Sequence, residues 1–440
     1  KSQSGSFSAR FRSPKRRAGG GYKGMLHPKQ VGTKSALQWK SMSSILNPPP
    51  DEHSDPAHPR IISLYHGSSS PSLPFTRTKS TGVNARVPWP ECDEEEFQRG
   101  KALLRTLDLD ALTFQPDTLV HLALEIFEEL DLPAALKLPV EKLQRFILAV
   151  RGRMYDNPYH NFWHVFDVTQ TAYALGLATG LIAALAPMEK FALIVAALCH
   201  DLEHPGVNNM LLVHSLDTDT KFRDKLSLEK HHSLRAFELL VDHDIDLLQG
   251  LNTMMYYQFR DCVVKIILAT DMSKHAQYMQ RISAARESFN NELHRPWSCE
   301  SAAASRKDLR REYAQLGMEV LIKCSDTSNV IKPFAVAKKW AHRVTEEFFK
   351  QGDMEKTSGL EVSKTCDREK ETRVGLQKGF IDYLTTPFYE LCAELFPNMD
   401  KNLQRMRENR RMWDEYSDER LEAECGGYKQ QQQQAALALG

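Results

Sequence analysis

Apolar residues recur at helical spacing along most of the chain from about residue 91 onward. Asp117 is a candidate N-cap, and after it the apolar side chains of Leu119, Leu122 and Ile126 lie on one face of a helix. No segment alternates polar and apolar residues as a strand does. We therefore predict one all-α domain over residues 91–425. The same spacing predicts further helices near residues 139–155, 160–186, 188–204, 228–241, 256–292, 308–325, 333–350, 369–395 and 399–415.

The two ends of the chain differ from this pattern. Residues 1–40 contain ten Lys or Arg and no Asp or Glu, and nine of the 21 prolines lie in residues 41–90. Such segments bury too little apolar surface to offset the entropy lost on ordering. We expect residues 1–90 to form a disordered basic and then Pro/Ser-rich linker, and residues 426–440 a disordered Gln-rich tail. Because the chain begins with Lys1, we expect it to be a piece of a longer protein.

Charge and cysteine content limit the classes of partner and compartment. The chain carries 57 basic and 57 acidic side chains, and because residues 1–40 hold +10, the remaining residues hold −10. The basic segment lacks the interleaved aromatic residues typical of single-strand binding, so we expect no nucleic-acid partner. Eight cysteines without a CxxC pair do not form a disulfide framework, and they indicate a reducing, cytoplasmic location.

One uncharged run, residues 168–188, is long enough to span a bilayer. It contains several polar residues and a proline, and histidines and aspartates flank it and the next apolar run. We interpret both runs as buried core helices and expect no membrane span in this chain.

Two histidine pairs are the first candidates for chemistry. His160 and His164 are spaced i,i+4, as are His200 and His204, and on a helix this spacing would place the two members of each pair on one face. Asp201 directly follows His200 at the end of an apolar run, where polar groups are costly unless something satisfies them. Imidazole and carboxylate are suitable zinc ligands, and carboxylate with water suits magnesium. The pattern therefore indicates a metal site.

Further polar residues adjoin apolar runs downstream. Glu229 precedes two histidines, while Thr270 and Asp271 follow an apolar run. Asp326 ends another apolar run. Any one of these residues alone fits a satisfied core or surface position, but together with the two histidine pairs they indicate a cluster of metal ligands at helix ends.

These motifs resemble the catalytic domain of class I 3′,5′-cyclic nucleotide phosphodiesterases, within the HD-type metal phosphohydrolases. The resemblance rests on the segments YHNFWH (159–164) and HDLEHPGVNN (200–209), and further on FFKQGD (348–353) and GLQKGFID (375–382). It extends over about residues 108–412. It implies a compact multi-helix fold and hydrolysis of cAMP, cGMP or both to nucleoside 5′-monophosphates in cyclic nucleotide signalling.

The resemblance also implies roles for the candidate residues. A first metal, zinc, would be bound by His164, His200, Asp201 and Asp326. Asp201 would also bridge to a second metal, magnesium or manganese. A hydroxide activated by both metals would attack phosphorus, and His160 would act as the general acid on O3′. Supporting roles next to the metal ligands are implied for Tyr159, His204, Glu229, Thr270 and Asp271.

A purine pocket is implied as well. Gln377 would hydrogen-bond the base edge, Phe380 and Val344 would form the two walls of a clamp, and Asn329 would approach the base. From the residues alone, Phe380 and Val344 fit a plain core position equally well. Because a glutamine amide can present either orientation, both cAMP and cGMP stay open as substrates.

Two other functions stay open from the sequence. One is an HD-type metal phosphohydrolase acting on another nucleotide, which needs the metal ligands but not Gln377 and Phe380. The other is a module that binds a cyclic nucleotide without turnover, and the intact His160 argues against it. The resemblance is also compatible with a homodimer and with regulatory regions outside this chain.

Overall fold

The computed structural model describes residues 88–215, 227–289, 291 and 304–427. Within these residues all regular structure is helical, which confirms the predicted all-α fold. The predicted linker and the predicted Gln-rich tail lie outside the described residues, except for Pro88–Pro90 of the linker and Gly426–Gly427 of the tail.

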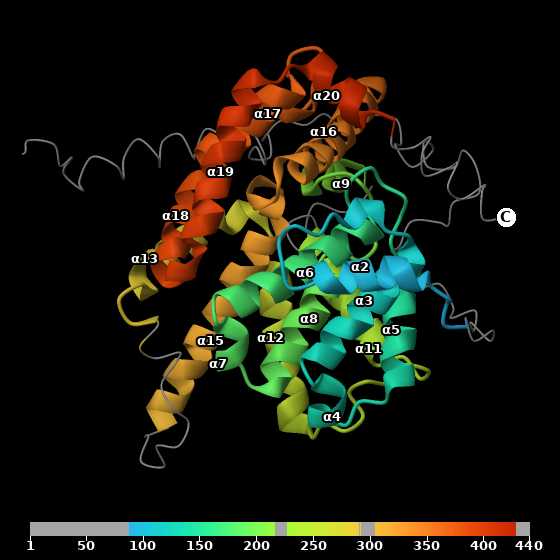
Figure 1. Ribbon diagram of the computed structural model, residues 1–440, viewed down its shortest axis with the longest axis vertical. Coiled ribbons are helices and arrows are strands. Elements are labelled where there is room, and N and C mark those ends of the chain that lie inside the picture. The colour runs from blue at the N-terminus through green and yellow to red at the C-terminus, as the bar shows by residue number, and fades with distance from the viewer. Residues whose placement is uncertain (1–87, 216–226, 290, 292–303, 428–440) are drawn as a thin grey trace, which may run out of the picture.

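Short connections join most of the helices (Figure 1). In chain order the helices are α2 (Glu94–Leu103), η2 (Ala111–Thr113), α3 (Pro116–Glu129), α4 (Leu132–Leu136), α5 (Val140–Gly152), α6 (Phe162–Ala178), α7 (Leu181–Ala184), α8 (Pro187–Cys199), α9 (Asn209–Ser215), α11 (Leu228–Leu240), α12 (Thr253–Leu268), η3 (Met272–Lys274), α13 (His275–Ala285), α15 (Ala304–Asp326), η4 (Ser328–Ile331), α16 (Phe334–Thr357), η5 (Lys364–Cys366), α17 (Arg373–Gly379), η6 (Phe380–Thr385), α18 (Thr386–Leu395), η7 (Pro397–Met399), α19 (Asp400–Met412), η8 (Trp413–Glu415) and α20 (Asp418–Cys425).

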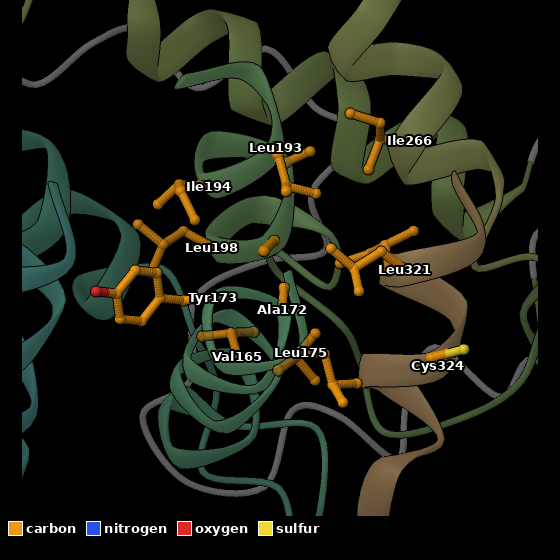
Figure 2. Close-up of a cluster of buried hydrophobic side chains, with 14 of the residues drawn as sticks. Val165, Ala172, Tyr173, Leu175, Leu193, Ile194, Leu198, Ile266, Leu321 and Cys324 are labelled. Atoms are coloured by element: carbon orange, nitrogen blue, oxygen red, sulfur yellow. The ribbon is translucent and has the colours of Figure 1, made fainter. Parts of the chain in front are cut away.

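Two apolar helices form the centre of the molecule. α6 and α8 pack against each other, α15 packs on α6, and α12 packs on α8 and α15. Figure 2 shows their side chains meeting in one core, with Leu175 of α6, Leu198 of α8 and Leu321 of α15 all buried. The uncharged run 168–188 contributes to this core. Among the residues that the structure describes, no helix combines the length and the apolar character needed to cross a membrane.

Two predicted helices are interrupted close to candidate site residues. The predicted helix 256–292 is divided between α12 and α13, and Thr270 and Asp271 lie in the break. There Asp271 accepts a hydrogen bond from the Ser273 amide (2.9 Å). Side chains that bond the local backbone in this way compete with helix formation, so the apolar spacing alone predicted too long a helix.

The predicted helix 369–395 is also divided, into α17, η6 and α18. The middle segment, η6, is π-helical, and the Thr385 hydroxyl donates to the carbonyls of Phe380 and Ile381 (both 3.4 Å). Such wider turns are rare and occur often at functional sites. Phe380, a predicted wall of the base clamp, is the first residue of this segment.

The C-terminal helices α16 to α20 form a second layer, drawn orange to red in Figure 1. α16 packs against η4, α17 and α20, and α19 packs against η4 and α18. A pocket lies between this layer and the ends of the central helices, since both contribute lining residues. The fold therefore brings the two groups of predicted site residues to one pocket.

Candidate active site

Four ligand candidates come together at the ends of three helices. His164 lies in the first turn of α6, where the Asn161 side chain accepts a hydrogen bond from the His164 amide (3.2 Å). His200 and Asp201 directly follow α8, and Asp326 is the last residue of α15. Their ligand atoms all lie within 4.8 Å of one another. The packed helices of the core therefore position all four candidate ligands.

The two imidazoles present Nε2 atoms to carboxylate oxygens. His164 Nε2 lies 3.2 Å from Asp201 Oδ2 and 3.4 Å from Asp326 Oδ1, and the corresponding His200 distances are 3.1 and 3.5 Å. His200 Nδ1–H donates to the Ala197 carbonyl (2.8 Å), which directs Nε2 at the carboxylates. Both Nε2 atoms are buried without a hydrogen-bond partner among the described residues. A divalent cation between these groups would satisfy them all.

Burial and the opposite charges of this cluster act on its pKa values in opposite directions. Burial lowers the pKa of His200, but the carboxylates of Asp201 and Asp326 outweigh it and hold that pKa well above its ordinary value. Burial raises the pKa of Asp201, but His200 and His160 hold it well below its ordinary value. The carboxylates that favour a positive charge on His200 would equally stabilise a cation, which binds imidazole in its deprotonated form.

His160 is held by Glu347, a carboxylate that was not among the residues predicted from the sequence. His160 Nδ1–H donates to Glu347 Oε1, while Glu347 Oε2 accepts from the backbone amides of Tyr159 (2.9 Å) and His160 (3.1 Å). Burial lowers the pKa of His160, but Glu347 and Asp201 raise it to about 9. His160 is therefore protonated at neutral pH, with Nε2 3.8 Å from Asp201 Oδ2.

His204 lies directly against His160. The two rings stack with their centroids 3.8 Å apart, and the Gly206 amide donates to His204 Nδ1 (3.0 Å). The proton of the neutral His204 ring is therefore on Nε2. Burial and the positive charge of His160 hold the pKa of His204 well below its ordinary value. Of the two stacked rings, one is thus charged and the other neutral.

A tight turn ties the two histidine motifs together. The Asn157 side-chain amide donates to the carbonyls of His160 (2.9 Å) and His204 (2.7 Å). Gly206 has a φ of +77°, and a Cβ at this position would lie 2.7 Å from Asn157 Oδ1. Both the backbone conformation and the close approach of Asn157 therefore favour glycine at position 206.

The other predicted residues around the metal ligands line the same pocket as Asp201, namely Tyr159, His204, Glu229, Thr270 and Asp271. Burial, and then the neighbouring Asp271 carboxylate, raises the pKa of Glu229. The Thr270 hydroxyl donates to the Ile267 carbonyl (2.8 Å). The Tyr159 ring packs on the His164 ring with centroids 4.4 Å apart. Two nearby carboxylates in a buried setting form a place where a cation is stabilised.

His232 is a second residue near the ligands that was not predicted. Its Nδ1–H donates to the Leu202 carbonyl (2.7 Å), and its Nε2, which lacks a hydrogen-bond partner within the described part of the chain, lies 3.8 Å from Asp201 Oδ1. Burial lowers the pKa of His232 to about 4, so the ring is neutral. The adjacent His231 instead contacts Glu203 (Nε2 to Oε2, 3.0 Å). Two consecutive histidines thus have different partners.

The predicted base-binding residues line the same pocket, whose volume is about 280 Å³, and they are Asn329, Val344, Gln377 and Phe380. Asn329 Nδ2 donates to Gln377 Oε1 (3.4 Å), which leaves the Gln377 Nε2 group for another acceptor. Val344 of α16 and Phe380 of η6 are half-buried, so part of each side chain remains open to the pocket. These residues therefore offer two apolar side chains and an amide group to the same pocket.

Sequence comparison relates the chain to one family. Residues 159–406 match the family described as 3′5′-cyclic nucleotide phosphodiesterase. The high affinity cGMP-specific 3′,5′-cyclic phosphodiesterase 9A of Mus musculus is 31% identical over 69% of this chain and 54% of its own length. The 3′,5′-cyclic-AMP phosphodiesterase 4C of Mus musculus is 31% identical over 82% of this chain and 52% of its own length. The chain therefore spans about half the length of these relatives.

A solved structure shares the arrangement of helices. The structure of LmjPDEB1 in complex with IBMX aligns with a TM-score of 0.63 and 30% sequence identity. The alignment covers 74% of this chain and 98% of that chain. The helical fold described above is thus also found in an experimentally solved protein.

Proposed function

The chain belongs to the 3′5′-cyclic nucleotide phosphodiesterase family, and from that premise we propose that it hydrolyses 3′,5′-cyclic nucleotides to nucleoside 5′-monophosphates. The observation that carries this proposal is a single pocket lined by Asp201 and His160 and also by Gln377 and Phe380. The first two belong to a set of groups suited to hydrolysis of a phosphodiester. The other two offer an amide and an aromatic face to a purine. The proposed catalytic domain covers residues 91–425.

The residues present fit a centre of two divalent cations. The first cation, zinc, would be held by His164, His200, Asp201 and Asp326. Asp201 would also be shared with the second, magnesium or manganese. The support is that two buried Nε2 atoms face carboxylate oxygens at 3.1 to 3.5 Å without a hydrogen-bond partner among the described residues. When bound, such cations supply an activated water and offset negative charge on the phosphoryl oxygens.

His160 would deliver the proton that the departing oxygen needs. Hydrolysis breaks the bond between phosphorus and O3′, and O3′ leaves more easily when it is protonated. Glu347 occupies Nδ1 of His160, so Nε2–H is the donor available on the pocket side. The Glu347 charge also keeps the ring protonated, while the stacked His204 stays neutral and does not compete for the proton.

The residues next to the ligands would orient water around the second cation. Glu229, Thr270 and Asp271 supply oxygen atoms to the pocket, and magnesium usually keeps several water molecules. The raised pKa of Glu229 supports this role, because a cation nearby would relieve the repulsion from Asp271. Tyr159 would fix the orientation of the His164 ring, on which it packs.

Gln377 would hydrogen-bond the purine edge while Val344 and Phe380 hold its two faces. The Asn329 contact engages the Gln377 oxygen, yet a glutamine amide that reverses would serve adenine as well as guanine. Relatives named for cGMP are up to 31% identical to this chain and relatives named for cAMP up to 35%, so both substrate classes occur among similar proteins. We therefore propose cAMP, cGMP or both as substrates.

We also propose a cellular location for the protein. The seven cysteines in the described part of the chain are free thiols, which supports a reducing, cytoplasmic location. A homodimer and regulatory regions outside this chain stay predictions.

The test is hydrolysis of cAMP and of cGMP by the complete chain, with zinc and magnesium restored after metal stripping. We expect turnover of at least one of them to the 5′-monophosphate, and the ratio of kcat/KM values gives the preference. Turnover of neither substrate would contradict the proposal. Binding without turnover would then indicate a non-catalytic module, and hydrolysis of a different nucleotide would indicate a broader HD-type phosphohydrolase.

A further inference from the structure

The first turn of α17 is held by a residue from the C-terminal helix. The Asp418 carboxylate accepts hydrogen bonds from the backbone amides of Arg373 (2.7 Å) and Val374 (3.0 Å). The Thr372 hydroxyl accepts one from the Gly375 amide (3.0 Å). The first amides of a helix have no partner within the helix, and a carboxylate there also interacts favourably with the helix dipole. Asp418, the first residue of α20, thus caps amide groups of α17 that have no partner within that helix.

The Arg373 side chain ties the same turn to α16. Its guanidinium donates to Thr345 Oγ1 (2.9 Å) and Glu346 Oε2 (2.7 Å), and it lies 3.5 Å from Glu422 of α20. Arg373 is 8% exposed, so its guanidinium is largely shielded from water, although Glu422 is not. Thr345 and Glu346 directly follow Val344, one wall of the base pocket. Arg373 therefore links the helix that carries Gln377 to the stretch of α16 that carries the opposing wall.

The C-terminal helix is itself firmly attached. Leu421 of α20 is fully buried, and Glu422 accepts a hydrogen bond from His342 of α16 (2.8 Å). Lys338 of α16 forms an ion pair with Glu424, two residues further along α20. The family match ends at residue 406, so α20 lies outside the matched segment and yet bonds to the helix that carries Gln377.

We propose that Asp418 is a positioning residue for recognition of the purine. By fixing the first turn of α17 against α16, it sets where Gln377 and Phe380 stand relative to Val344. α17 has only seven residues, so Gln377 lies one turn beyond Arg373, and any tilt of the helix moves the amide and the aromatic wall together. The expected effect of Asp418 on KM rests on the proposed function, whereas its expected effect on the first turn of α17 does not.

The test compares Asp418→Ala, Asp418→Asn and the unaltered chain. Loss of the cap in Asp418→Ala should raise KM for the cyclic nucleotide about tenfold while kcat stays within about twofold, because base binding weakens and the reacting groups are untouched. Asp418→Asn keeps an oxygen acceptor for one amide and should give an intermediate KM. Glu419→Ala removes an exposed charge from the same turn of α20 and should leave both constants unchanged.

A second measurement does not depend on activity. Hydrogen exchange of the Arg373, Val374 and Gly375 amides should be faster in Asp418→Ala than in Glu419→Ala. Unchanged exchange at these amides would overturn the proposal even if the enzyme is active, and so would an unchanged KM. A loss of kcat equal to the rise in KM would indicate general damage and would also overturn it. Absence of turnover in the unaltered chain counts against the proposed function alone, since the exchange result still decides the role of Asp418.

Discussion

The proposed reaction side of the pocket, around Asp201, and the proposed base side, around Gln377, are built in different ways. On the reaction side, His160 has a carboxylate partner in Glu347 and His200 is fixed by a backbone carbonyl. On the base side, Val344 and Phe380 are only half-buried, and the single side-chain bond between two of the predicted base-binding residues is long, at 3.4 Å. The groups around Asp201 are thus held by charged or backbone partners, whereas the walls around Gln377 offer mainly apolar surface.

Substitutions on the two sides should therefore change different kinetic constants. A change on the reaction side removes a charge or a proton donor that no neighbour replaces, so it should lower kcat. A change on the base side removes contact area or one hydrogen bond, so it should raise KM. Four substitutions test this difference, beginning with the largest expected effect.

Asp201→Asn should abolish most activity. The Asp201 carboxylate lies within 3.2 Å of both His164 and His200, and Asp201 belongs to both groups of potential metal ligands found among the described residues. We expect kcat/KM to fall by more than about 10³-fold, together with a loss of bound metal measured by mass spectrometry. Asp261→Asn, which alters an exposed carboxylate paired with Lys265, is the matched control. Retention of both metals and activity in Asp201→Asn would refute the ligand assignment.

His160→Gln should lower kcat by about 10²- to 10³-fold, because it removes the proposed general acid but no metal ligand. Bound metal should stay at the level of the unaltered protein, which separates this variant from Asp201→Asn. His243→Gln changes a histidine whose side chain is fully exposed and should have no effect. An unchanged kcat in His160→Gln would mean that another group protonates O3′.

Glu347→Gln should lower kcat by about 10- to 100-fold, the usual effect of altering a residue that orients a functional group. The neutral amide can still accept bonds from the Tyr159 and His160 amides, but it no longer stabilises a positive charge on the His160 ring. The exposed Glu361 provides a control in Glu361→Gln. If KM rose and kcat did not change, Glu347 would belong to the base side instead.

Gln377→Ala should have the smallest effect on kcat and should raise KM by about tenfold, as expected for one lost hydrogen bond in a shielded pocket. The measurement is made with cAMP and with cGMP, and the substrate with the larger rise is the one that the amide favours. Gln404→Ala on the surface of α19 is the control. A fall in kcat as large as that of Glu347→Gln would contradict the expectation that substitutions on the base side act mainly on KM.

The candidate metal ligands could be predicted from the sequence because burying a polar side chain at the end of an apolar helix costs free energy unless a partner satisfies it. His200 and Asp201 end an apolar run, and such a position needs a specific partner. Val344 and Phe380 could not be separated from plain core residues, because apolar spacing is the same on a pocket wall and in a core. Only the resemblance to a family singled them out.

Other features depend on contacts that no local pattern contains. Glu347 meets His160 across 187 positions of the chain, and its sequence neighbours give no hint of that pairing. His231 and His232 are adjacent, and only the fold decides that one faces Glu203 and the other Asp201. The break between α12 and α13 was missed because side-chain bonds to the local backbone outweighed an apolar pattern that continues through it.

The spread of the four ligand candidates along the chain, from His164 to Asp326, also bears on how the protein resists heat. Such a constellation exists only in the folded chain, so a cation that binds it would add to the free energy of unfolding. At a free metal concentration 100 times the dissociation constant the gain would be about 2.7 kcal/mol. A chelator should then lower the melting temperature, and the melting temperature should rise with the concentration of free metal.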